Sequence, residues 1–493
     1  MIRPVSDYVK SVSQLSNYLG IKSDLNFDFS GITSDSRSVE SGDLFVALPG
    51  SNSHGAKYID EVILAGAVGA ITDEAGLEII GGKLPVILIN NPRQFLGDIC
   101  SWFYNSPSIS MNVIGITGTN GKTTTTAILN QILKIAGKST GLIGTTGIEV
   151  GPEKLVANFT TPEASELQSL LATMDERHIS HVSMEVSSHA IEAKRIAGTR
   201  FSMVGFTNLT QDHLDFHGDM ASYFSAKAKL FTSQYTDLAF INIDDAYGKK
   251  LFDNGEIPMI SLSRESAQAQ WHYERIETSG FGYSIAIRGT GGILIEGQFN
   301  LIGEHNLDNL LMAVAIASQL EVDPLVIGNS FAQIIGAPGR LEKVELGQKF
   351  LALVDFAHTP DAVNRILATL RKCTEGRVIA VLGCGGDRDK TKRPIMGEEL
   401  LAGSDLAIFT SDNPRNESPE DILKQMVSGL TLKENSCIIS DRREAIALAV
   451  ASALPQDCVV ILGKGHETGQ EISGKKLAFD DRIELARAIE ELA

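Results

Sequence analysis

Short apolar runs that end in glycine-rich or polar turns recur along the chain. In the first hundred residues they occupy 44–50, 67–72 and 84–90, and the stretch between the first two has the apolar spacing of a helix. Apolar runs of this length, bounded by turn residues, predict buried β-strands. Proline and serine in 105–110 predict a linker, so the pattern indicates a first domain over 1–108.

The second block opens at 111–137 with an apolar strand, a glycine-rich loop and an amphipathic helix that ends at Gly137. Alternation of strands with helices predicts a mostly parallel sheet covered on both faces. From 256 to 300 the alternation of apolar and polar residues predicts an antiparallel appendage. A glycine- and proline-containing segment at 334–342 marks the end of this domain, which we expect over 109–336. Further apolar runs lie at 181–188, 203–209 and 238–244.

The third block, expected over 337–493, repeats this alternation of strands and helices. Its apolar runs again lead into polar, glycine-rich turns. In open α/β sheets, ligands bind beside the carboxyl ends of the strands. The sequence therefore predicts three α/β domains, the last of them Rossmann-like. The strands and turns of this block lie at 350–356, 377–390, 406–415 and 457–467.

Composition limits the class of partner. The chain has 493 residues, with 43 Lys and Arg against 61 Asp and Glu, so its net charge is −18. Such an acidic chain is a poor partner for nucleic acid or an anionic membrane. Five scattered cysteines with no C-x-x-C pair indicate a reducing compartment. Apolar runs too short to span a bilayer and a start without a signal-peptide pattern predict a cytoplasmic protein with no membrane span.

The strongest chemical signal lies between the first strand and the first helix of the second block. A glycine-rich loop lets backbone N–H groups surround phosphate oxygens, while lysine offsets their charge and threonine can bind Mg²⁺. The strict phosphate-loop pattern needs glycine at position 116, where this chain has Ile116, so the loop is a variant. Neither the kinase motif set nor a guanine-binding signature follows. The predicted phosphate-binding residues are Gly118, Thr119, Asn120, Gly121, Lys122, Thr123 and Thr124.

Two polar segments, 184–189 and 208–218, each follow an apolar run in the same block. A carboxylate and imidazoles at strand ends can hold a divalent ion beside bound phosphates. Taken singly, each histidine is more readily explained by a structural hydrogen bond, but their shared position downstream of a phosphate loop favours the metal site. The helical segment 222–231 carries Lys227 and Lys229, and the residues alone do not distinguish between them.

Charged turns follow three strands of the third block. Arginine presents a planar fork that binds carboxylates through two hydrogen bonds, so Arg388 and Arg415 indicate a substrate with two carboxylates, or with a carboxylate and a phosphate. A structural Arg–Asp pair is an equal alternative for each arginine alone. Glu467 would either receive a substrate ammonium or cap the next helix.

Together these segments resemble the Mur ligases, the ATP-dependent enzymes that build the peptidoglycan stem peptide. The resemblance spans nearly the whole chain, and the motifs occur in the family order. They are DSRSVESGDLFVALPG, TGTNGKTTTT, MEVSSHA, NLTQDHLDFHGD, GEHNLDN, the GR pair at 339–340, VDFAHTPDA, GCGGDRDKTKRP, SDNPRNESP and GKGHE.

The resemblance implies a reaction, and it is closest to the family member that adds the third amino acid. ATP would phosphorylate the free D-glutamate carboxylate of UDP-N-acetylmuramoyl-L-Ala-D-Glu, with Mg²⁺ as cofactor. An amine of meso-diaminopimelate would then attack the acyl phosphate and give an amide, ADP and phosphate. The Asp-Asn-Pro-Arg motif resembles the diaminopimelate-adding type, a choice that depends on Arg415. The implied setting is a monomer in cytoplasmic peptidoglycan synthesis, and hence a role in cell-wall biogenesis, cell shape, cell division and the cell cycle.

The resemblance also assigns residues to ligands, and one departure is Ala193, where some relatives have glutamine. Lys122, Glu185, His213 and Lys227 would be catalytic. Thr123, Glu185, His213 and a carbamylated Lys227 would hold metal, and Asn306, Arg340 and Asp355 would join the phosphate loop in binding ATP. The UDP-muramoyl-dipeptide would take Ser34, Ser36, Ser51, Asn52, Ser53, Thr160, Thr161, Ser187 and Arg195. Diaminopimelate would take Arg388, Asp412, Asn413, Pro414, Arg415, Gly463 and Glu467.

Three alternatives are compatible with parts of this pattern. A relative that adds L-lysine would share everything except the arginine of the Asp-Asn-Pro-Arg motif. Folylpolyglutamate synthetase shares the ATP domain and its chemistry, but the N-terminal DSR…GDLFVALPG segment favours a UDP-sugar ligand. A non-catalytic nucleotide-binding regulator would not need the set Lys122, Glu185, His213 and Lys227.

Overall fold

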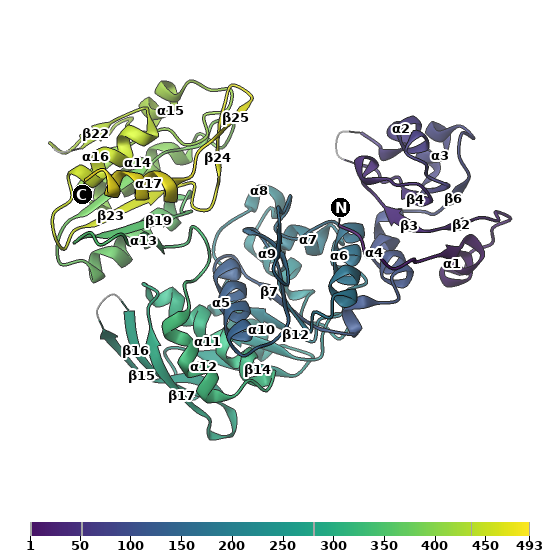
Figure 1. The fold of residues 1–493 in the computed structure, drawn as a ribbon, viewed down its shortest axis with the longest axis horizontal. Coiled ribbons are helices and arrows are strands. Elements are labelled where there is room, and N and C mark those ends of the chain that lie inside the picture. Colours follow the sequence, from purple (N-terminus) through teal and green to yellow (C-terminus); the bar gives the residue numbers. More distant parts are fainter. Residues whose placement is uncertain (1, 51–52, 280–281, 435, 493) are drawn as a thin grey trace. The chain divides into compact units, whose positions relative to one another are not determined.

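The computed structural model describes residues 2–50, 53–279, 282–434 and 436–492 (Figure 1). Ser51 and Asn52, two of the residues assigned to the UDP site, lie outside this description. The chain forms two compact units, and each is described by itself. The first contains 1–274, 287–295 and 308–330, and the second contains 275–286, 296–307 and 331–493.

The first unit begins with a four-stranded, all-parallel sheet in the order β3-β4-β5-β6. Successive residues of β4 face opposite sides of this sheet. Leu44 and Val46 join one apolar cluster, whereas Phe45 joins another, so both faces are buried. The strands are β3 (Gly31–Thr33), β4 (Asp43–Val46), β5 (Gly69–Thr72) and β6 (Val86–Leu88), with helices α1 (Val12–Leu19), α2 (Ile59–Leu64), α3 (Glu74–Ile80) and α4 (Pro92–Phe103). A small antiparallel pair, β1 (Lys10–Ser11) and β2 (Asp28–Phe29), lies beside α1.

The second sheet has eleven strands in the order β10-β9-β8-β11-β7-β12-β13-β14-β15-β16-β17. The strands from β8 through β11, β7, β12, β13 and β14 to β15 pair in parallel. Its first seven strands along the chain are β7 (Asn112–Thr117), β8 (Thr140–Gly144), β9 (Gly147–Val150), β10 (Glu153–Leu155), β11 (His181–Glu185), β12 (Met203–Phe206) and β13 (Ala239–Asn242). The remaining strands are β14 (Met259–Ser263), β15 (Trp271–Ser279), β16 (Gly282–Arg288) and β17 (Leu294–Phe299).

The helices of this region alternate with the parallel strands, as the sequence pattern predicted. They are α5 (Lys122–Ile135), α6 (Ala164–Glu176), α7 (Ser188–Glu192), α8 (Leu214–His217), α9 (Met220–Ala228), α10 (Ala246–Asp253), α11 (Glu304–Gln319) and α12 (Pro324–Ser330). The antiparallel appendage expected from residue 256 is wrong for its first part, because β14 and β15 continue the parallel sheet. At the opposite edge of the sheet, β9 pairs antiparallel with β8 and β10.

The second unit contains a six-stranded sheet in the order β18-β19-β23-β20-β21-β22, parallel except for the edge strand β18. Along β20, Val378, Ala380 and Leu382 face one apolar cluster, and Ile379 and Val381 face the other. Helices α13, α14 and α15 contribute to the first cluster, and α16 and α17 to the second, so the sheet is covered on both faces. This is the Rossmann-like arrangement that the alternation predicted.

The strands of this sheet are β18 (Glu342–Lys343), β19 (Leu351–Asp355), β20 (Val378–Leu382), β21 (Leu406–Phe409), β22 (Cys437–Ile438) and β23 (Cys458–Leu462). Its helices are α13 (Pro360–Cys373), α14 (Lys392–Gly403), α15 (Pro419–Met426), α16 (Arg442–Ala451) and α17 (Asp481–Glu490). A hairpin, β24 (Gly469–Ile472) and β25 (Lys475–Ala478), follows β23. Within the described ranges, the structure contains no helix with the length and apolarity that a membrane crossing requires.

Candidate active site

Three predicted motifs meet at the carboxyl ends of adjacent strands in the first unit. Strand β7 lies between β11 and β12, and all three run parallel. The phosphate loop follows β7, Glu185 ends β11, and Asn208 follows β12. Parallel strands end at the same edge, so the order of the sheet brings together segments that are far apart in the sequence.

The loop itself requires glycine at two positions. Gly118 has φ of 149°, and a Cβ there would lie 1.9 Å from the Thr207 hydroxyl oxygen. Gly121, in the left-handed region at φ of 86°, would place a Cβ 2.4 Å from the Asn309 side-chain oxygen. Neither space accepts a side chain, so the variant loop keeps glycine where its backbone approaches its neighbours.

The β12 side of the site fixes the loop backbone. The Thr119 N–H donates to the Asn208 carbonyl oxygen at 2.8 Å, and the Asn120 N–H donates to the Asn208 side-chain oxygen at 3.0 Å. The Thr207 hydroxyl donates to the Asn120 carbonyl oxygen at 2.6 Å. Thr207 was not among the predicted site residues, although it belongs to the run at 203–209 that the pattern marked as a strand.

Two lysines donate to one carbonyl oxygen of the loop. Lys122 Nζ lies 2.9 Å from both the Gly118 and Thr119 oxygens, and Lys227 Nζ lies 2.9 Å from the same Gly118 oxygen. Lys227 is almost fully buried and lies over the ring of Tyr223. Burial, reinforced by the positive charge of Lys122, lowers the pKa of Lys227 well below its usual value.

The neighbouring Lys229 is different. It is half exposed and forms an ion pair with Glu192 at 2.6 Å. The structure thus distinguishes two lysines that composition alone could not. Lys227 contacts the phosphate loop from α9, and Lys229 lies at the surface.

Glu185 lies beside the loop with 1% of its surface exposed. Its carboxylate accepts from the Thr123 hydroxyl at 2.9 Å, from the Thr145 N–H at 2.8 Å and from the Thr145 hydroxyl at 3.2 Å. A hydroxyl and a carboxylate at the start of a phosphate-loop helix form an oxygen donor set that fits Mg²⁺. Thr145, in the turn between β8 and β9, has no motif in the sequence that would have identified it.

Three histidines gather near this edge. The rings of His189 and His213 lie 4.8 Å apart between centroids, and His217 stacks on Tyr223 at 4.8 Å. His217 Nε2 is 2.9 Å from the Ser188 hydroxyl oxygen. Across the described part of the chain, no group of three or more His, Cys, Asp or Glu side chains is arranged to hold a metal ion. The full metal set with His213 and Lys227 stays a prediction.

The residues assigned to the muramoyl peptide surround the end of β11. The Thr161 hydroxyl donates to the Glu185 carbonyl oxygen at 2.8 Å and accepts from the Ser187 N–H at 3.1 Å. The hydroxyls of Thr160 and Thr145 are 3.0 Å apart. Because these contacts converge on Glu185 and its neighbours, the structure brings the predicted peptide-binding residues to the phosphate loop.

Arg195 lies at this end of the site. Its guanidinium pairs with Glu163 at 2.7 Å and stacks on the ring of Phe159 at 4.5 Å. Glu163 also pairs with Arg93 at 3.4 Å, from the start of α4. Sequence reasoning identified Arg195 but missed Glu163, which directly precedes α6.

Of the residues assigned to the UDP site, Ser34 has a clear contact. Its hydroxyl lies 3.0 Å from that of Ser165, in the first turn of α6. Ser36 and Ser53 are half buried in the loops that follow β3 and β4. This group of assignments stays a prediction.

In the second unit, too, predicted motifs meet at the carboxyl ends of parallel strands. The carboxyl ends of β19, β20, β21 and β23 lie side by side, and each is followed by one of the predicted motifs. After β19, Asp355 accepts from the Leu341 and Ala357 N–H groups, both at 2.7 Å. Burial raises the pKa of Asp355, and Arg340 opposes this rise. Arg340 stacks on Phe356 at 4.7 Å.

Asn306 is buried in the same unit, where its side-chain N–H donates to the Ile302 carbonyl oxygen at 2.7 Å. Asn306, Arg340 and Asp355 thus belong to one unit. Their assignment to ATP stays a prediction.

A hydrogen-bonded triad follows β21 and β23, with Lys464 and Asn413 buried and Glu467 partly exposed. Lys464 Nζ donates to the Asn413 side-chain oxygen at 3.0 Å and to Glu467 at 2.9 Å, and the Asn413 amide donates to Glu467 at 2.8 Å. Burial acts to raise the pKa of Glu467, but Lys464 and Asn413 lower it overall, so the carboxylate is ionised. The alternative helix-capping role of Glu467 is wrong, because the next element is strand β24. Lys464 was missed, although it stands within the GKGHE motif.

The two arginines of the predicted carboxylate site differ. Arg415 donates to the Gly386 carbonyl oxygen at 2.7 Å and pairs with Glu471 at 3.2 Å. Arg388 is exposed, and among the described residues it has no hydrogen bond or ion pair. Neither arginine makes the structural Arg–Asp pair that was the alternative interpretation.

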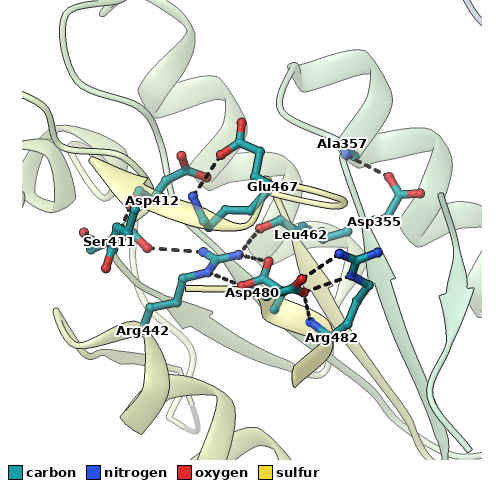
Figure 2. A network of polar contacts seen from close by, with 12 residues as sticks. Asp355, Ala357, Ser411, Asp412, Arg442, Leu462, Glu467, Asp480 and Arg482 are labelled. Atoms are coloured by element: carbon teal, nitrogen blue, oxygen red, sulfur yellow. Dashed lines mark hydrogen bonds and ion pairs between the residues drawn. The ribbon is translucent and has the colours of Figure 1, made fainter. Parts of the chain in front are cut away.

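Figure 2 shows a network of polar contacts that includes Arg442. The buried Arg442 pairs with the buried Asp481 at 2.6 Å and donates to the Ser411 and Leu462 carbonyl oxygens at 3.2 and 2.9 Å. It thereby links the residues at which the chain leaves β21 and β23. Gly463, with φ of 113°, follows directly, and a Cβ there would lie 2.6 Å from Asp412. Sequence reasoning missed Arg442, which begins a helix and belongs to no motif.

The fold and the two groups of residues define an α/β protein in which a glycine-rich loop joins a parallel strand to a helix in the first unit, and polar and charged side chains gather at the strand ends of the second unit. The chain belongs to the Mur ligase family. It matches the family's catalytic domain over 28–104, the Mur ligase middle domain over 116–317, and the Mur ligase glutamate ligase domain over 339–465. The predicted three-domain α/β fold, with a central parallel-sheet domain, is confirmed.

Known proteins resemble the chain along its whole length. UDP-N-acetylmuramoyl-L-alanyl-D-glutamate--2,6-diaminopimelate ligase of Streptomyces coelicolor is 42% identical to it, over 99% of this chain and 98% of the relative. A solved structure of a UDP-N-acetylmuramoyl-L-alanyl-D-glutamate--2,6-diaminopimelate ligase has a TM-score of 0.71 and 31% identity, and covers 99% of both chains. MurF ligase from Thermotoga maritima in complex with ADP shares the fold, with a TM-score of 0.61, 17% identity and coverage of 94% of this chain and 96% of that one.

The lowered pKa of Lys227 predicts how stability depends on pH. In the unfolded chain the side chain stays protonated up to about pH 10. Between the lowered pKa and that value the unfolded state binds more protons, so the free energy of unfolding of the wild type rises with pH. Lys227→Met removes this term. The stability of the wild type relative to Lys227→Met should increase between about pH 7 and pH 9, by at most about 1.4 kcal/mol per pH unit.

Urea unfolding followed by tryptophan fluorescence measures this change, because Trp102 and Trp271 both lie in the first unit. Lys229→Met, which replaces the exposed neighbouring lysine in the same way, is the matched control. A constant difference for Lys227→Met would show that the buried amine keeps its ordinary pKa.

Proposed function

We propose that this protein joins meso-diaminopimelate to UDP-N-acetylmuramoyl-L-Ala-D-Glu with hydrolysis of ATP to ADP and phosphate, as a step in peptidoglycan precursor synthesis. The observation that carries the proposal is the full-length similarity to enzymes named for this activity, at 42% identity over 99% of the chain. The two strand-end sites supply the chemistry that such a reaction needs. The proposal includes action as a monomer in the cytoplasm and, through the cell wall, a role in cell shape and division.

The first step would transfer the γ-phosphoryl group of ATP to a carboxylate oxygen of the muramoyl dipeptide. The bond between the β- and γ-phosphates breaks, a carbon–oxygen–phosphorus link forms, and ADP leaves. Two anions must approach each other, so positive charge at the loop lowers the barrier. Lys122 supplies this charge. Backbone N–H groups of the loop, whose conformation depends on Gly118 and Gly121, would surround the phosphates.

Magnesium fits the donor set of Thr123 and Glu185, which already form a hydrogen bond at 2.9 Å. When bound, Mg²⁺ would neutralise phosphate charge. Binding of ADP by the related MurF ligase from Thermotoga maritima supports an adenine nucleotide as the ligand of this fold.

Lys227 is proposed to carry a carbamate. A neutral amine is the form that adds to carbon dioxide, and burial beside Lys122 favours that form. The product is an anion on a side chain that now donates to Gly118, and it would offset the charge of Lys122. With His213 it would complete a second metal site, as the family resemblance implies.

The second step would be attack by an amine of diaminopimelate on the acyl phosphate. A carbon–nitrogen bond forms, phosphate leaves from the tetrahedral intermediate, and the amine loses a proton. Glu467, ionised by its contacts with Lys464 and Asn413, would receive an ammonium group of the substrate. Arg415 and Arg388 would bind its distal carboxylate. These charges favour diaminopimelate over L-lysine, which lacks that carboxylate.

Phosphate release tests the proposed activity directly. Purified protein, ATP and Mg²⁺ are incubated with UDP-N-acetylmuramoyl-L-Ala-D-Glu and, in parallel, with meso-diaminopimelate, L-lysine or no amino acid. Release that requires the muramoyl dipeptide and is fastest with diaminopimelate is the expected result. Faster turnover with L-lysine would replace the amino-acid assignment, and a glutamyl-folate substrate in place of the dipeptide tests the folylpolyglutamate alternative.

Arg415→Ala should raise the KM for diaminopimelate about tenfold to a hundredfold, because a charge-assisted hydrogen bond contributes about 1.5–3 kcal/mol. The KM for ATP should change by less than about twofold, because Arg415 contacts Gly386 and Glu471 and is not among the residues assigned to ATP. Steady-state kinetics with each substrate varied in turn measures both values. Arg365→Ala, which removes a surface arginine from α13, is the matched control. Equal loss of affinity for ATP and diaminopimelate would contradict the assignment.

Lys227→Ala should abolish turnover, because it removes the proposed carbamate. Acetate or formate added at high concentration should restore part of the activity by occupying the vacated space with a carboxylate. Lys229→Ala should keep activity close to that of the wild type and should not respond to the added acids. An inactive Lys227→Ala that no carboxylic acid rescues would argue against the carbamate.

A further inference from the structure

The two arginine-bearing loops of the second unit are joined to each other. We call residues 383–390, which follow β20 and carry Arg388, the glycine loop, and residues 411–417, which follow β21 and carry Arg415, the arginine loop. The Gly386 N–H donates to the Asn413 carbonyl oxygen at 2.8 Å. A Cβ at Gly386 would lie 1.9 Å from the Pro414 oxygen, so the two backbones are in direct contact.

Glu417 ends the arginine loop and binds the glycine loop. Its carboxylate accepts from the Asp387 N–H at 2.6 Å and pairs with Lys390 at 3.1 Å. Asp387 is the residue directly before Arg388. The carboxylate of Glu417 therefore holds the backbone directly before Arg388.

A buried arginine fixes Glu417 in this position. Arg393, on α14, has a fully buried side chain and donates to both oxygens of Glu417, at 2.8 and 3.0 Å. It also donates to the Gly385 carbonyl oxygen at 3.1 Å. Hydrogen bonds from Arg393 and from the Asp387 N–H lower the pKa of Glu417 well below its usual value, so the carboxylate is charged at every pH at which the enzyme would work.

Both loops hold a strained residue at the point of contact. Asp387 and Arg415 each have φ of 51°, in the left-handed region that non-glycine residues seldom adopt. Such conformations persist when surrounding contacts fix them. Glu417 supplies one of these contacts to Asp387, and the exposed Asn416 supplies another, since its side-chain N–H donates to Asp387 at 2.8 Å.

We propose that Glu417 is a positioning residue that fixes the distance between Arg388 and Arg415 and thereby sets selectivity for an amino acid with a distal carboxylate. The inference rests on the proposed function, because it takes these two arginines as the carboxylate site. Glu417 itself contacts no substrate. Its carboxylate acts through the Asp387 N–H and Arg393, which fix the glycine loop against the arginine loop.

The variant Glu417→Gln keeps the size of the side chain and removes its charge. We expect the KM for diaminopimelate to rise about tenfold or more, because the variant weakens the charge-assisted hydrogen bonds that fix the glycine loop. The KM values for ATP and for the muramoyl dipeptide should stay within about twofold of the wild type. The preference for diaminopimelate over L-lysine in kcat/KM should fall by a factor similar to the rise in KM. Glu420→Gln, whose side chain accepts hydrogen bonds from Ser418 and Ser440, is the matched control.

Amide hydrogen exchange gives a readout that does not need activity. The N–H groups of Gly386 and Asp387 should exchange faster in Glu417→Gln than in the wild type, and those of the sheet should not. Unchanged exchange in 385–390 would overturn the inference. So would an unchanged KM for diaminopimelate, or an equal rise in the KM of all three substrates, which would mark a general structural role.

A second variant covers the case in which Glu417→Gln does not fold. Asn416→Ala removes an exposed contact between the same loops, so the fold should remain intact. It should raise the KM for diaminopimelate about two- to tenfold, as expected for one hydrogen bond. An unchanged KM would overturn the proposal. Wild-type turnover with diaminopimelate tests the proposed function separately, because the inference about Glu417 is taken from the change between wild type and variants and from hydrogen exchange.

Discussion

Two lysine side chains donate to one carbonyl oxygen at the phosphate loop, and the arrangement of the loop and its neighbours depends on this contact. Lys122 and Lys227 both donate to the Gly118 oxygen, and Lys227 is buried. Two like charges in so small a space repel each other, and the cost falls when one amine is neutral or when negative charge is present. Phosphate groups and a carbamate would each supply that charge. The close approach depends on Gly118 and Gly121, which leave no room for a side chain.

In the second unit, buried positive charges are neutralised by ion pairs within the protein. Buried cations at its strand ends each have an anionic partner: Lys464 with Glu467, Arg442 with Asp481, and Arg393 with Glu417. These pairs fix the loops that carry the more accessible Arg388 and Arg415, the residues proposed to bind carboxylates. The net charge of −18 therefore describes the body of the protein and not these strand ends, where positive groups are placed locally.

The sequence predicted the residues of the motifs but not the residues that hold those motifs in place. The strand, loop and helix at 111–137 were predicted because apolar spacing and glycine position are local signals, and β7 and α5 confirm them. Thr145, Glu163, Lys464, Arg393 and Arg442 were missed, because their roles arise from contacts between separate segments of the chain. The parallel pairing of β14 and β15 was not predicted either, because the direction of pairing depends on the neighbouring strand and not only on the residues of one strand.

Transfer of oxygen from the muramoyl dipeptide to phosphate tests the central claim most directly. The dipeptide is prepared with ¹⁸O in its free D-glutamate carboxylate and incubated with the protein, ATP, Mg²⁺ and meso-diaminopimelate. If ATP phosphorylates the carboxylate and the amine then displaces phosphate, each phosphate released with product should carry one carboxylate oxygen, and mass spectrometry should find ¹⁸O in it. Product formed together with unlabelled phosphate would contradict an acyl phosphate route.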